Sequence, residues 1–584
     1  MKTTRRQFLG GSAALAATML TPRTRAVFAE ENHVPGSGRP AFAFLHTYEA
    51  TGRYWAGLQR SGLLRPGTGI RLVNSPFGSD DRRFNTVARR DGPLHAILAE
   101  NRTYFVVDRV AGGSPYNAYP FDVDLVRHYA EMLGPMFLGG QVHEVVSNLH
   151  NDWGRFVKAN PAFATEPVSK EGLQGALDWN NAASWLEYGT VDDYLGQRHP
   201  QSDHEWRLAI ESAMTRQGGR FSAHYSYCEG THWGELMWHV AYQLGAASCF
   251  VEVGPWASTS SALAIASARG AAKAFNKPWG VFYAPWGPNG CTSFIGVDDW
   301  SWQAPREAMD NSNWPVGPEK GPSTALQRRI FFHAYLSGAW TLHEEWGAEG
   351  NLLNWESGEL SSYGRVTKAL LDFQQACPDV GEPFTPIALI HDVTGPLPNS
   401  APWQKLKESL FAYSESDSSN AARETSGKAE AVCYPPSAVP ELYDIFPSDA
   451  PASALAGYPM RISVSAASVA DGSAWRQLSG AAQKLCPFSW ETHLPKQVNR
   501  RASGEWIIAV HNPWGAVRGD VYGVGSVLDG ACAATEVLTF KTPIDEVQLL
   551  NAWPEDCELK QDGDALRLRV GPGGLIIIRV RTRA

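Results

Sequence analysis

The chain has 584 residues, more than one hydrophobic core can serve, so two or three domains are expected. A net charge of −9, with no tract rich in Lys and Arg, argues against a nucleic-acid-binding protein. The 22 Trp, 19 Tyr and 24 Phe suit carbohydrate binding, because aromatic faces stack on sugar rings, but they also fill protein cores.

The N-terminus resembles a twin-arginine export signal. Residues 4–10 read TRRQFLG, a short apolar run from Ser12 to Leu20 follows, and small residues near Ala29 offer a cleavage point. The apolar run is too short to span a bilayer. We therefore expect residues 1–29 to be removed, which leaves a periplasmic or extracellular protein with no membrane segment in its mature form.

The cysteines give no sign of a metal site. None of the eight lies in a C-x-x-C pair, and their spacing matches no zinc template. Cys228 and Cys249 lie in strand-like segments and are expected to be core residues. No Gly-rich phosphate-binding fingerprint follows the first predicted strand, so neither a metal nor an organic cofactor is predicted.

Beyond a Gly/Pro-rich linker at residues 30–40, short apolar strands alternate with amphipathic helices. Strands are expected near residues 41, 103, 136, 222, 249, 280, 340 and 387. Eight strands, most of them followed by a helix, predict a (β/α)8 TIM barrel over residues 41–395. An open doubly wound sheet is the alternative architecture.

The pattern changes after residue 395. Residues 396–490 predict a small α/β segment that contains a polar loop. Residues 491–584 alternate apolar and polar side chains with a period of two, which predicts an antiparallel β-sandwich. The predicted fold class is therefore α/β, a TIM barrel followed by a small α/β segment and a C-terminal β-sandwich.

Several predicted barrel strands carry or end in an acidic residue. Glu345 shares a strand face with Thr341 and His343, opposite Trp340 and Leu342, and is expected to face the barrel interior. Glu252 has inward parity in its own strand. Glu229 ends another strand, and a carboxylate buried at such a place costs on the order of several kcal/mol unless it is paired, hydrated or used.

Glu144 ends the strand near residue 136. Strict alternation would place it outside with Met136, Leu138 and Val142, whereas Gln141 and His143 have inward parity. Strand ends often leave register, so Glu144 is expected at the mouth. Each glutamate alone is as well explained by a structural ion pair, but several acids at one mouth favour glycosidic bond cleavage, which needs two carboxyl groups.

These strand-end acids, the pairs Trp286-Gly287 and Trp346-Gly347, and the order of barrel, α/β segment and β-sandwich resemble the retaining (β/α)8 glycoside hydrolases that include the β-galactosidases. The resemblance spans residues 40–584 and implies a carbohydrate substrate. In that group the acid/base follows an Asn at the end of strand four, and the nucleophile ends strand seven. Glu345 ends the predicted strand seven, whereas the predicted strand four ends in Tyr227-Cys228-Glu229 and has no Asn–Glu pair.

We predict Glu345 as the nucleophile and Glu144 as the acid/base, with Glu252 the rival for either role. Glu144 ends the predicted strand three, which lies across the barrel from strand seven. Other groups with inward parity or a place at a strand end are expected to contact the sugar: His46, Tyr48, Asp108, Arg109, His143, His224, Glu229, Tyr283, Trp286, Glu344 and Trp346.

Two other functions fit the same sequence. A polysaccharide lyase would use a Tyr or His base together with an Arg or a metal. A non-catalytic carbohydrate-binding protein on a barrel scaffold would lack a close carboxyl pair at the mouth. A redox enzyme is a third idea, because many twin-arginine passengers carry cofactors, but no cofactor motif is present.

Overall fold

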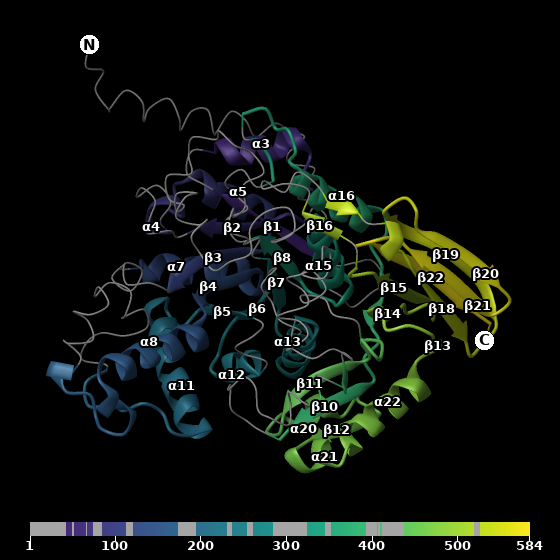
Figure 1. The fold of residues 1–584 in the computed structure, drawn as a ribbon. Coiled ribbons are helices and arrows are strands. Elements are labelled where there is room, and N and C mark those ends of the chain that lie inside the picture. The colour runs from purple at the N-terminus through teal and green to yellow at the C-terminus, as the bar shows by residue number, and fades with distance from the viewer. Residues whose placement is uncertain are drawn as a thin grey trace.

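The structure is a computed structural model in which helices surround a closed barrel of parallel strands (Figure 1). Within the described part of the chain, no helix combines the length and the apolar character needed to cross a bilayer. The predicted export signal and linker, and the site candidates Glu345, Trp286 and Trp346, lie outside that part. The structure describes residues 42–48, 52–65, 67–73, 84–111, 121–172, 194–230, 236–253, 261–283, 324–344, 352–354, 356–392, 406, 409–410, 437–514, 516–518, 526–528 and 530–583.

The predicted (β/α)8 barrel is confirmed. Eight strands pair in parallel in chain order, and the barrel closes where Ala43 and Phe44 of the first strand pair with Thr341 and Leu342 of the last. The strands are β1 (Ala43–Tyr48), β2 (Gly69–Val73), β3 (Phe105–Ala111), β4 (Phe137–His143), β5 (Tyr225–Gly230), β6 (Ser248–Val253), β7 (Trp279–Tyr283) and β8 (Thr341–Glu344).

Helices connect the strands and cover the outside of the barrel. They are α3 (Arg53–Ser61), α4 (Phe84–Val87), α5 (Pro93–Asn101), α7 (Val123–Leu133), η2 (Gly134–Met136), α8 (Val145–Ala159), η3 (Pro161–Ala164), α11 (Asp203–Arg220), α12 (Met237–Gln243), α13 (Ser261–Phe275), α15 (Thr324–Leu336) and α16 (Ser362–Ala376).

The predicted strand near residue 387 is not part of the barrel. It is β10 (Ile387–His391), which pairs with two strands further along the chain. The missing barrel strand is β2, which the sequence pattern does not reveal because a buried Arg71 interrupts its apolar residues. An apolar run such as that of β10 indicates a buried strand but does not say which sheet it joins.

The strand count therefore shifts by one from β2 onward. Glu144 follows β4, Glu229 and Glu252 lie on β5 and β6, and Glu344 ends β8. The predicted match of Glu345 to the seventh strand is wrong, because the strand before it is β8. The predicted relation across the barrel survives, since β4 and β8 are four strands apart in a ring of eight, as strands three and seven would be.

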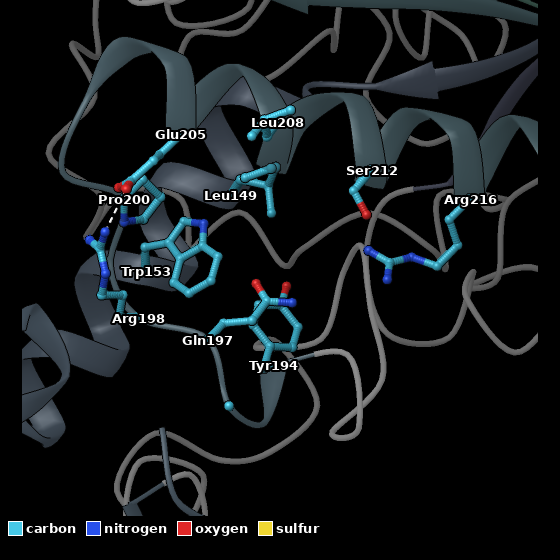
Figure 2. A pocket seen from close by; sticks show the side chains of 12 residues that line it. Leu149, Trp153, Tyr194, Gln197, Arg198, Pro200, Glu205, Leu208, Ser212 and Arg216 are labelled. Atoms are coloured by element: carbon cyan, nitrogen blue, oxygen red, sulfur yellow. Dashed lines mark hydrogen bonds and ion pairs between the residues drawn. The ribbon is translucent and has the colours of Figure 1, made fainter. Parts of the chain in front are cut away.

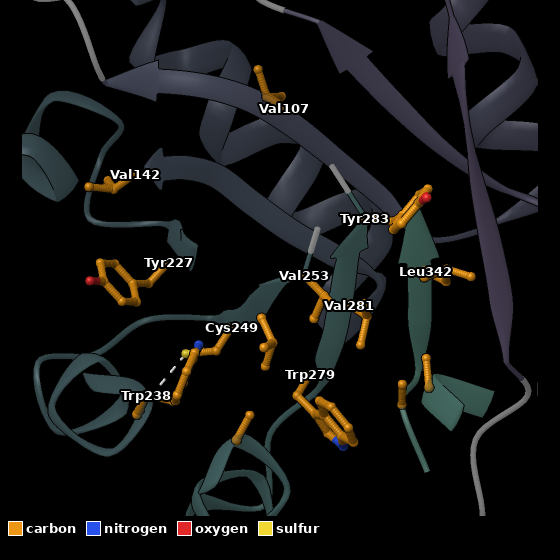
Figure 3. Close-up of a cluster of buried hydrophobic side chains, with 14 of the residues drawn as sticks. Val107, Val142, Tyr227, Trp238, Cys249, Val253, Trp279, Val281, Tyr283 and Leu342 are labelled. Carbon is orange, nitrogen blue, oxygen red and sulfur yellow. Dashed lines mark hydrogen bonds between the residues drawn. The ribbon is translucent and has the colours of Figure 1, made fainter. Parts of the chain in front are cut away.

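Side chains alternate between the two faces of the barrel wall. The outward residues pack on the helices, as Figure 3 shows for Val107, Val142, Val281 and Leu342. The inward apolar residues form a separate plug: Ala43, Leu45, Tyr104, Val106, Leu138, Cys228, Phe250 and Phe282. The lower barrel is thus a packed core, and polar chemistry is confined to the carboxyl ends of the strands.

The predicted α/β segment and β-sandwich are also present, in green and yellow in Figure 1. A parallel sheet is built from β10, β11 (Tyr443–Pro447) and β12 (Met460–Val464), with helices α20 (Ala452–Leu455), α21 (Ala466–Ala470) and α22 (Ser473–Leu485). Two antiparallel sheets follow and share one buried apolar cluster. Strand β21 (Ala565–Val570) contributes Leu566 and Leu568 to it, and strand β22 (Leu575–Thr582) contributes Ile576 and Ile578.

The first antiparallel sheet has the order β13 (Phe488–Trp490), β18 (Ala534–Phe540), β21 (Ala565–Val570) and β20 (Glu558–Asp562). The second has the order β19 (Ile544–Trp553), β22 (Leu575–Thr582), β15 (Trp506–His511), β14 (Lys496–Arg500) and β9 (Glu382–Pro383). A small pair, β16 (Ala516–Arg518) and β17 (Ser526–Leu528), and the short helix η5 (Gly530–Cys532) complete this region.

A buried ionic network joins barrel helix α13 to strand β11. Arg269 contacts Asp444 at 2.6 Å and Glu441 at 2.7 Å, and Lys273 contacts Asp444 at 2.6 Å. Burial alone would raise the pKa of Asp444, but the positive charges of Lys273 and Arg269 outweigh it and lower the pKa to about 2. The carboxylate is therefore ionised over the whole neutral range and fixes the α/β segment against the barrel.

Asp444→Asn is expected to reduce the free energy of unfolding by about 3–5 kcal/mol at pH 7, because it leaves buried cations short of a partner. A lowered carboxylate pKa stabilises the fold above the ordinary Asp pKa, and this contribution is lost as the pH falls toward 2. Denaturant unfolding should therefore show that the difference in free energy of unfolding between wild type and Asp444→Asn is smaller at pH 3 than at pH 7. Asp91→Asn, in the exposed pair with Arg89, is the control and should change nothing measurable. If Asp444→Asn and Asp91→Asn were equally stable at pH 7, Asp444 would not be the residue that fixes the α/β segment against the barrel.

Candidate active site

Polar side chains line the barrel interior toward the carboxyl ends of its strands. β1 to β3 contribute Thr47, Arg71 and Asp108, while β4, β6 and β8 contribute His143, Glu252 and His343. All of them are buried. In a barrel of this type that rim is where ligands bind and react.

Arg71 and Asp108 form an ion pair whose side chains are fully buried. The Arg71 guanidinium donates to Asp108 through Nε at 3.0 Å and through Nη2, and Nη1 donates to the Glu344 carbonyl at 2.8 Å and to Thr47 Oγ1 at 3.3 Å. Asp108 is therefore hydrogen-bonded to Arg71. The sequence alone suggests instead that Asp108 contacts a sugar. The side chain of its neighbour Arg109 lies outside the described part of the structure.

A bulge in β4 aims His143 into the barrel. The register with β3 shifts between Phe137 and Gly139, so Leu138 faces inward, Val142 faces outward, and Gln141 and His143 face inward again. The expectation that Leu138 shares a face with Val142 is wrong for this reason. Gly139 has φ 92°, and a Cβ there would lie 2.7 Å from the His224 carbonyl oxygen.

Glu144 and Glu252 approach the same imidazole from two strands. His143 Nε2 lies 3.8 Å from Glu144 Oε2 and 3.5 Å from Glu252 Oε2. The two oxygens therefore lie no more than about 7 Å apart, an upper bound set by these two distances. The Glu144 side chain is 30% exposed and that of Glu252 only 4%, so Glu144 meets solvent while Glu252 lies beneath it.

The backbone of Glu144 adopts a left-handed conformation, with φ 51° and ψ 47°, just before helix α8. Its N–H donates to the Cys228 carbonyl at 2.8 Å, which holds the end of β4 against β5. A non-glycine residue in this region costs about 1–3 kcal/mol, and such strain concentrates at functional sites.

Glu229 faces helix α8 instead of the mouth. Its carboxyl group accepts hydrogen bonds from the Val146 N–H at 3.0 Å and from the Tyr227 hydroxyl. Burial, followed by the negative charge of Glu144, raises the pKa of Glu229 to about 8. At neutral pH Glu229 is therefore largely uncharged and does not repel Glu144.

Cys228 faces the barrel interior next to His143. Burial raises the pKa of its thiol well above the ordinary value, and the negative charges of Glu252 and Glu144 add to this effect. His343, between Phe250 and Phe282, is uncharged, because burial and then the charge of Arg71 lower its pKa well below the ordinary value.

Five other predicted sugar contacts lie away from the barrel mouth. His46 and Tyr48 face the helices, where Tyr48 packs on Trp55 of α3 and burial lowers the pKa of His46 to about 3. Tyr283 packs on Phe331 of α15.

Glu344 also faces outward, and its Oε1 accepts from Gln327 Nε2 of α15 at 2.7 Å. His224 lies at the amino end of the barrel, where it contacts the Phe137 carbonyl at 3.1 Å. Strand parity, counted from the observed pairing, explains the outward positions of His46, Tyr48, Tyr283 and Glu344.

A separate cavity of 430 Å³ lies between helices α8 and α11 (Figure 2). Trp153, Tyr194, Gln197 and Arg216 are among its lining residues. Its one described carboxylate, Glu205, is paired with Arg198 at 2.5 Å. This cavity therefore offers no carboxyl pair, unlike the barrel mouth.

No protein-family model matches the sequence, and no curated protein matches it either. An alpha-L-fucosidase isoenzyme 2 from Paenibacillus thiaminolyticus is 8% identical, with a TM-score of 0.41 over 93% of this chain and 99% of that one. A beta-galactosidase from the Antarctic haloarchaeon Halorubrum lacusprofundi is 10% identical, with a TM-score of 0.39 over 92% and 98% of the two chains. Similarities this weak support no conclusion about activity, and the barrel fold stands on its own strand pairing.

Gly139→Ala is expected to reduce the free energy of unfolding by about 2–4 kcal/mol, because the positive φ and the close His224 carbonyl leave no room for a Cβ. Gly154→Ala, on the exposed face of α8 with open space around it, is the matched control and should stabilise by about 0.5–1 kcal/mol. Denaturant unfolding of the two variants measures whether each substitution lowers or raises the free energy of unfolding. A Gly139→Ala protein as stable as wild type would mean that the bulge does not need glycine.

Proposed function

We propose that the protein is a glycoside hydrolase that cleaves a polysaccharide or oligosaccharide with two carboxyl groups, by a retaining mechanism and without an organic cofactor. The observation that carries the proposal is Glu144, a partly exposed carboxyl group that follows β4 at the carboxyl end of a closed barrel, beside His143 and the buried Glu252. Glycosidic bond cleavage needs two carboxyl groups, of which Glu144 is one in this proposal.

Glu144 is the acid/base in this proposal. It is the more exposed of the two carboxyl groups, and it is held in a strained backbone conformation at the end of β4. The resemblance to retaining (β/α)8 glycosidases places the acid/base at the end of strand four, and the corrected strand count puts Glu144 there. His143 stands where that group has Asn.

Glu345 is proposed as the nucleophile. It follows β8, in which His343 faces inward and Leu342 and Glu344 face outward, so continued alternation would turn Glu345 inward. β8 lies opposite β4, which suits attack on the sugar face opposite the acid. This assignment departs from the family pattern, in which strand seven carries the nucleophile, since β7 ends at Tyr283.

The described mouth favours hydrolysis over the two alternatives. A lyase would use a Tyr or His base with an Arg or a metal. In the described mouth Arg71 is paired with Asp108 and both Tyr48 and Tyr283 face the helices, so His143 and a metal beside it would have to take these roles. A non-catalytic binding protein would not need two carboxyl groups on one histidine. Assay on a panel of polysaccharides and aryl glycosides, with NMR of the anomer first released, tests the hydrolase directly; no hydrolysis of any member would reject it.

The two carboxyl roles predict different kinetic signatures. Glu144→Ala should lose about 10²–10⁴-fold in kcat/KM on poor leaving groups but keep much of its activity on activated aryl glycosides, which need little protonation. Glu345→Ala should be nearly inactive on both, and azide should restore turnover as a glycosyl azide of inverted configuration.

Glu344→Gln is the control for Glu345→Ala, because the Glu344 side chain faces Gln327 and its neutral analogue should keep activity within a few-fold. An active Glu345→Ala enzyme would reject the nucleophile assignment. Dependence on the leaving group in Glu252→Ala, and not in Glu144→Ala, would move the acid/base to Glu252.

The proposed setting is outside the cytoplasm, after export by the twin-arginine route. The exported protein should then begin near Glu30, as the small residues before it indicate. Intact-mass measurement of protein recovered from outside the cytoplasm checks this, with Arg5→Lys/Arg6→Lys as the variant expected to stay inside. Exported material that still carries Arg5 and Arg6 would contradict the cleavage.

A further inference from the structure

Three side chains from neighbouring strands bring metal-ligating atoms together at the barrel mouth. His143 of β4 pairs in register with Cys228 of β5, and Cys228 pairs in turn with Phe250 of β6. Glu252 lies two residues after Phe250 on the same strand and so has the same inward direction. One nitrogen, one sulfur and one carboxylate oxygen from these residues all lie within 4.8 Å of one another. All three residues are buried.

The donor set suits zinc. Zn²⁺ takes imidazole nitrogen, thiolate sulfur and carboxylate oxygen at about 2.0–2.3 Å, which places tetrahedral ligands about 3.5 Å apart. Side-chain shifts of about 1 Å would therefore bring these atoms to bonding distance. A mixed set with a thiolate favours Zn²⁺ over Mg²⁺ or Ca²⁺, which prefer oxygen ligands alone.

The hydrogen bond of His143 to Gln141 fixes the imidazole for ligation. His143 Nδ1 lies 3.2 Å from Gln141 Oε1, and because an amide oxygen only accepts, Nδ1 must carry the proton. In the neutral ring the lone pair is then on Nε2, the nitrogen that faces Glu144 and Glu252. Ligating histidines characteristically donate their other ring N–H to such an acceptor.

Negative charge gathers around the same point. The carboxyl oxygens of Glu144 and Glu252 lie 3.8 and 3.5 Å from His143 Nε2. A buried region with this field attracts a cation, and the field adds to the affinity that the three ligands provide.

We propose that His143, Cys228 and Glu252 form a zinc site at the carboxyl end of the barrel. The site stands on ligand geometry and goes beyond the proposed glycosidase, since it holds whether or not the mouth cleaves a glycoside. Zn²⁺ replaces the proton of the Cys228 thiol, which is released to solvent. Three protein ligands leave a fourth position open to water or a substrate hydroxyl, next to Glu144.

The test uses the full chain, loaded with zinc or cobalt and dialysed against metal-free buffer. Wild type should retain close to one equivalent of zinc, and the cobalt form should show a thiolate-to-cobalt charge-transfer band. Cys228→Ala should lose that band and bind zinc at least 100-fold more weakly. Cys249→Ala, which removes an equally buried thiol that faces the helix layer on β6, should keep both the band and the affinity.

Gln141→Leu should weaken zinc binding about 10-fold, as expected when the group that orients a ligating histidine is lost. X-ray absorption of wild-type zinc protein, which needs no variant, should show one sulfur among nitrogen and oxygen ligands. A wild type without retained zinc, a first shell without sulfur, or a Cys228→Ala protein with an unchanged band would each overturn the site. Zinc binding without glycosidase activity would reject the proposed function only, and activity in protein that binds no metal would reject the zinc site only.

Discussion

The buried Arg71–Asp108 pair is the interaction on which the barrel mouth depends. Through its guanidinium Arg71 reaches β3 at Asp108, β1 at Thr47 and β8 at the Glu344 carbonyl, so one side chain from β2 ties together the strands on both sides of the closing seam. A charge in this position is tolerated only with a partner, because an uncompensated buried ion costs several kcal/mol. Asp108 is therefore held by Arg71, and the pair fixes the β1 to β3 side of the mouth.

The mouth divides into two halves with different tasks. The half formed by β8, β1, β2 and β3 is held by the Arg71 network. The half formed by β4, β5 and β6 carries His143, Cys228 and Glu252, with Glu144 above them. Its carboxyl groups are not paired with Arg71, which binds Asp108 in the other half. The neutral form of Glu229, buried against α8, lets Glu144 remain close without a second full charge beneath it. A cation or a polar substrate is complementary to the acidic half.

The fold was largely predictable from the sequence, because seven of the eight barrel strands are short apolar runs before or after amphipathic helices. The eighth could not be predicted, since β2 contains Arg71, whose burial depends on Asp108, a partner 37 residues away. The arrangement of side chains at the barrel mouth was harder to predict from the sequence, also because it depends on contacts between distant residues. Parity places both His143 and Glu252 inward, and the bulge at Gly139 changes only the face of Leu138. That His143, Cys228 and Glu252 meet, however, follows only from strand pairing. A sequence motif with fixed spacing cannot identify three ligands that come from three separate strands.

The different burial of the two carboxyl groups reconciles the hydrolytic proposal with the zinc proposal. A general acid must reach the leaving oxygen of a bound sugar, and the partly exposed Glu144 can do so. Glu252 is almost completely buried and shares His143 with Glu144, so it is better placed to hold a group beneath the substrate than to attack the anomeric carbon. Assigning Glu252 to a metal or to a supporting contact leaves the nucleophile to a strand opposite β4. That is where Glu345 follows β8, so the geometry of the acidic half favours a nucleophile from the other half of the mouth.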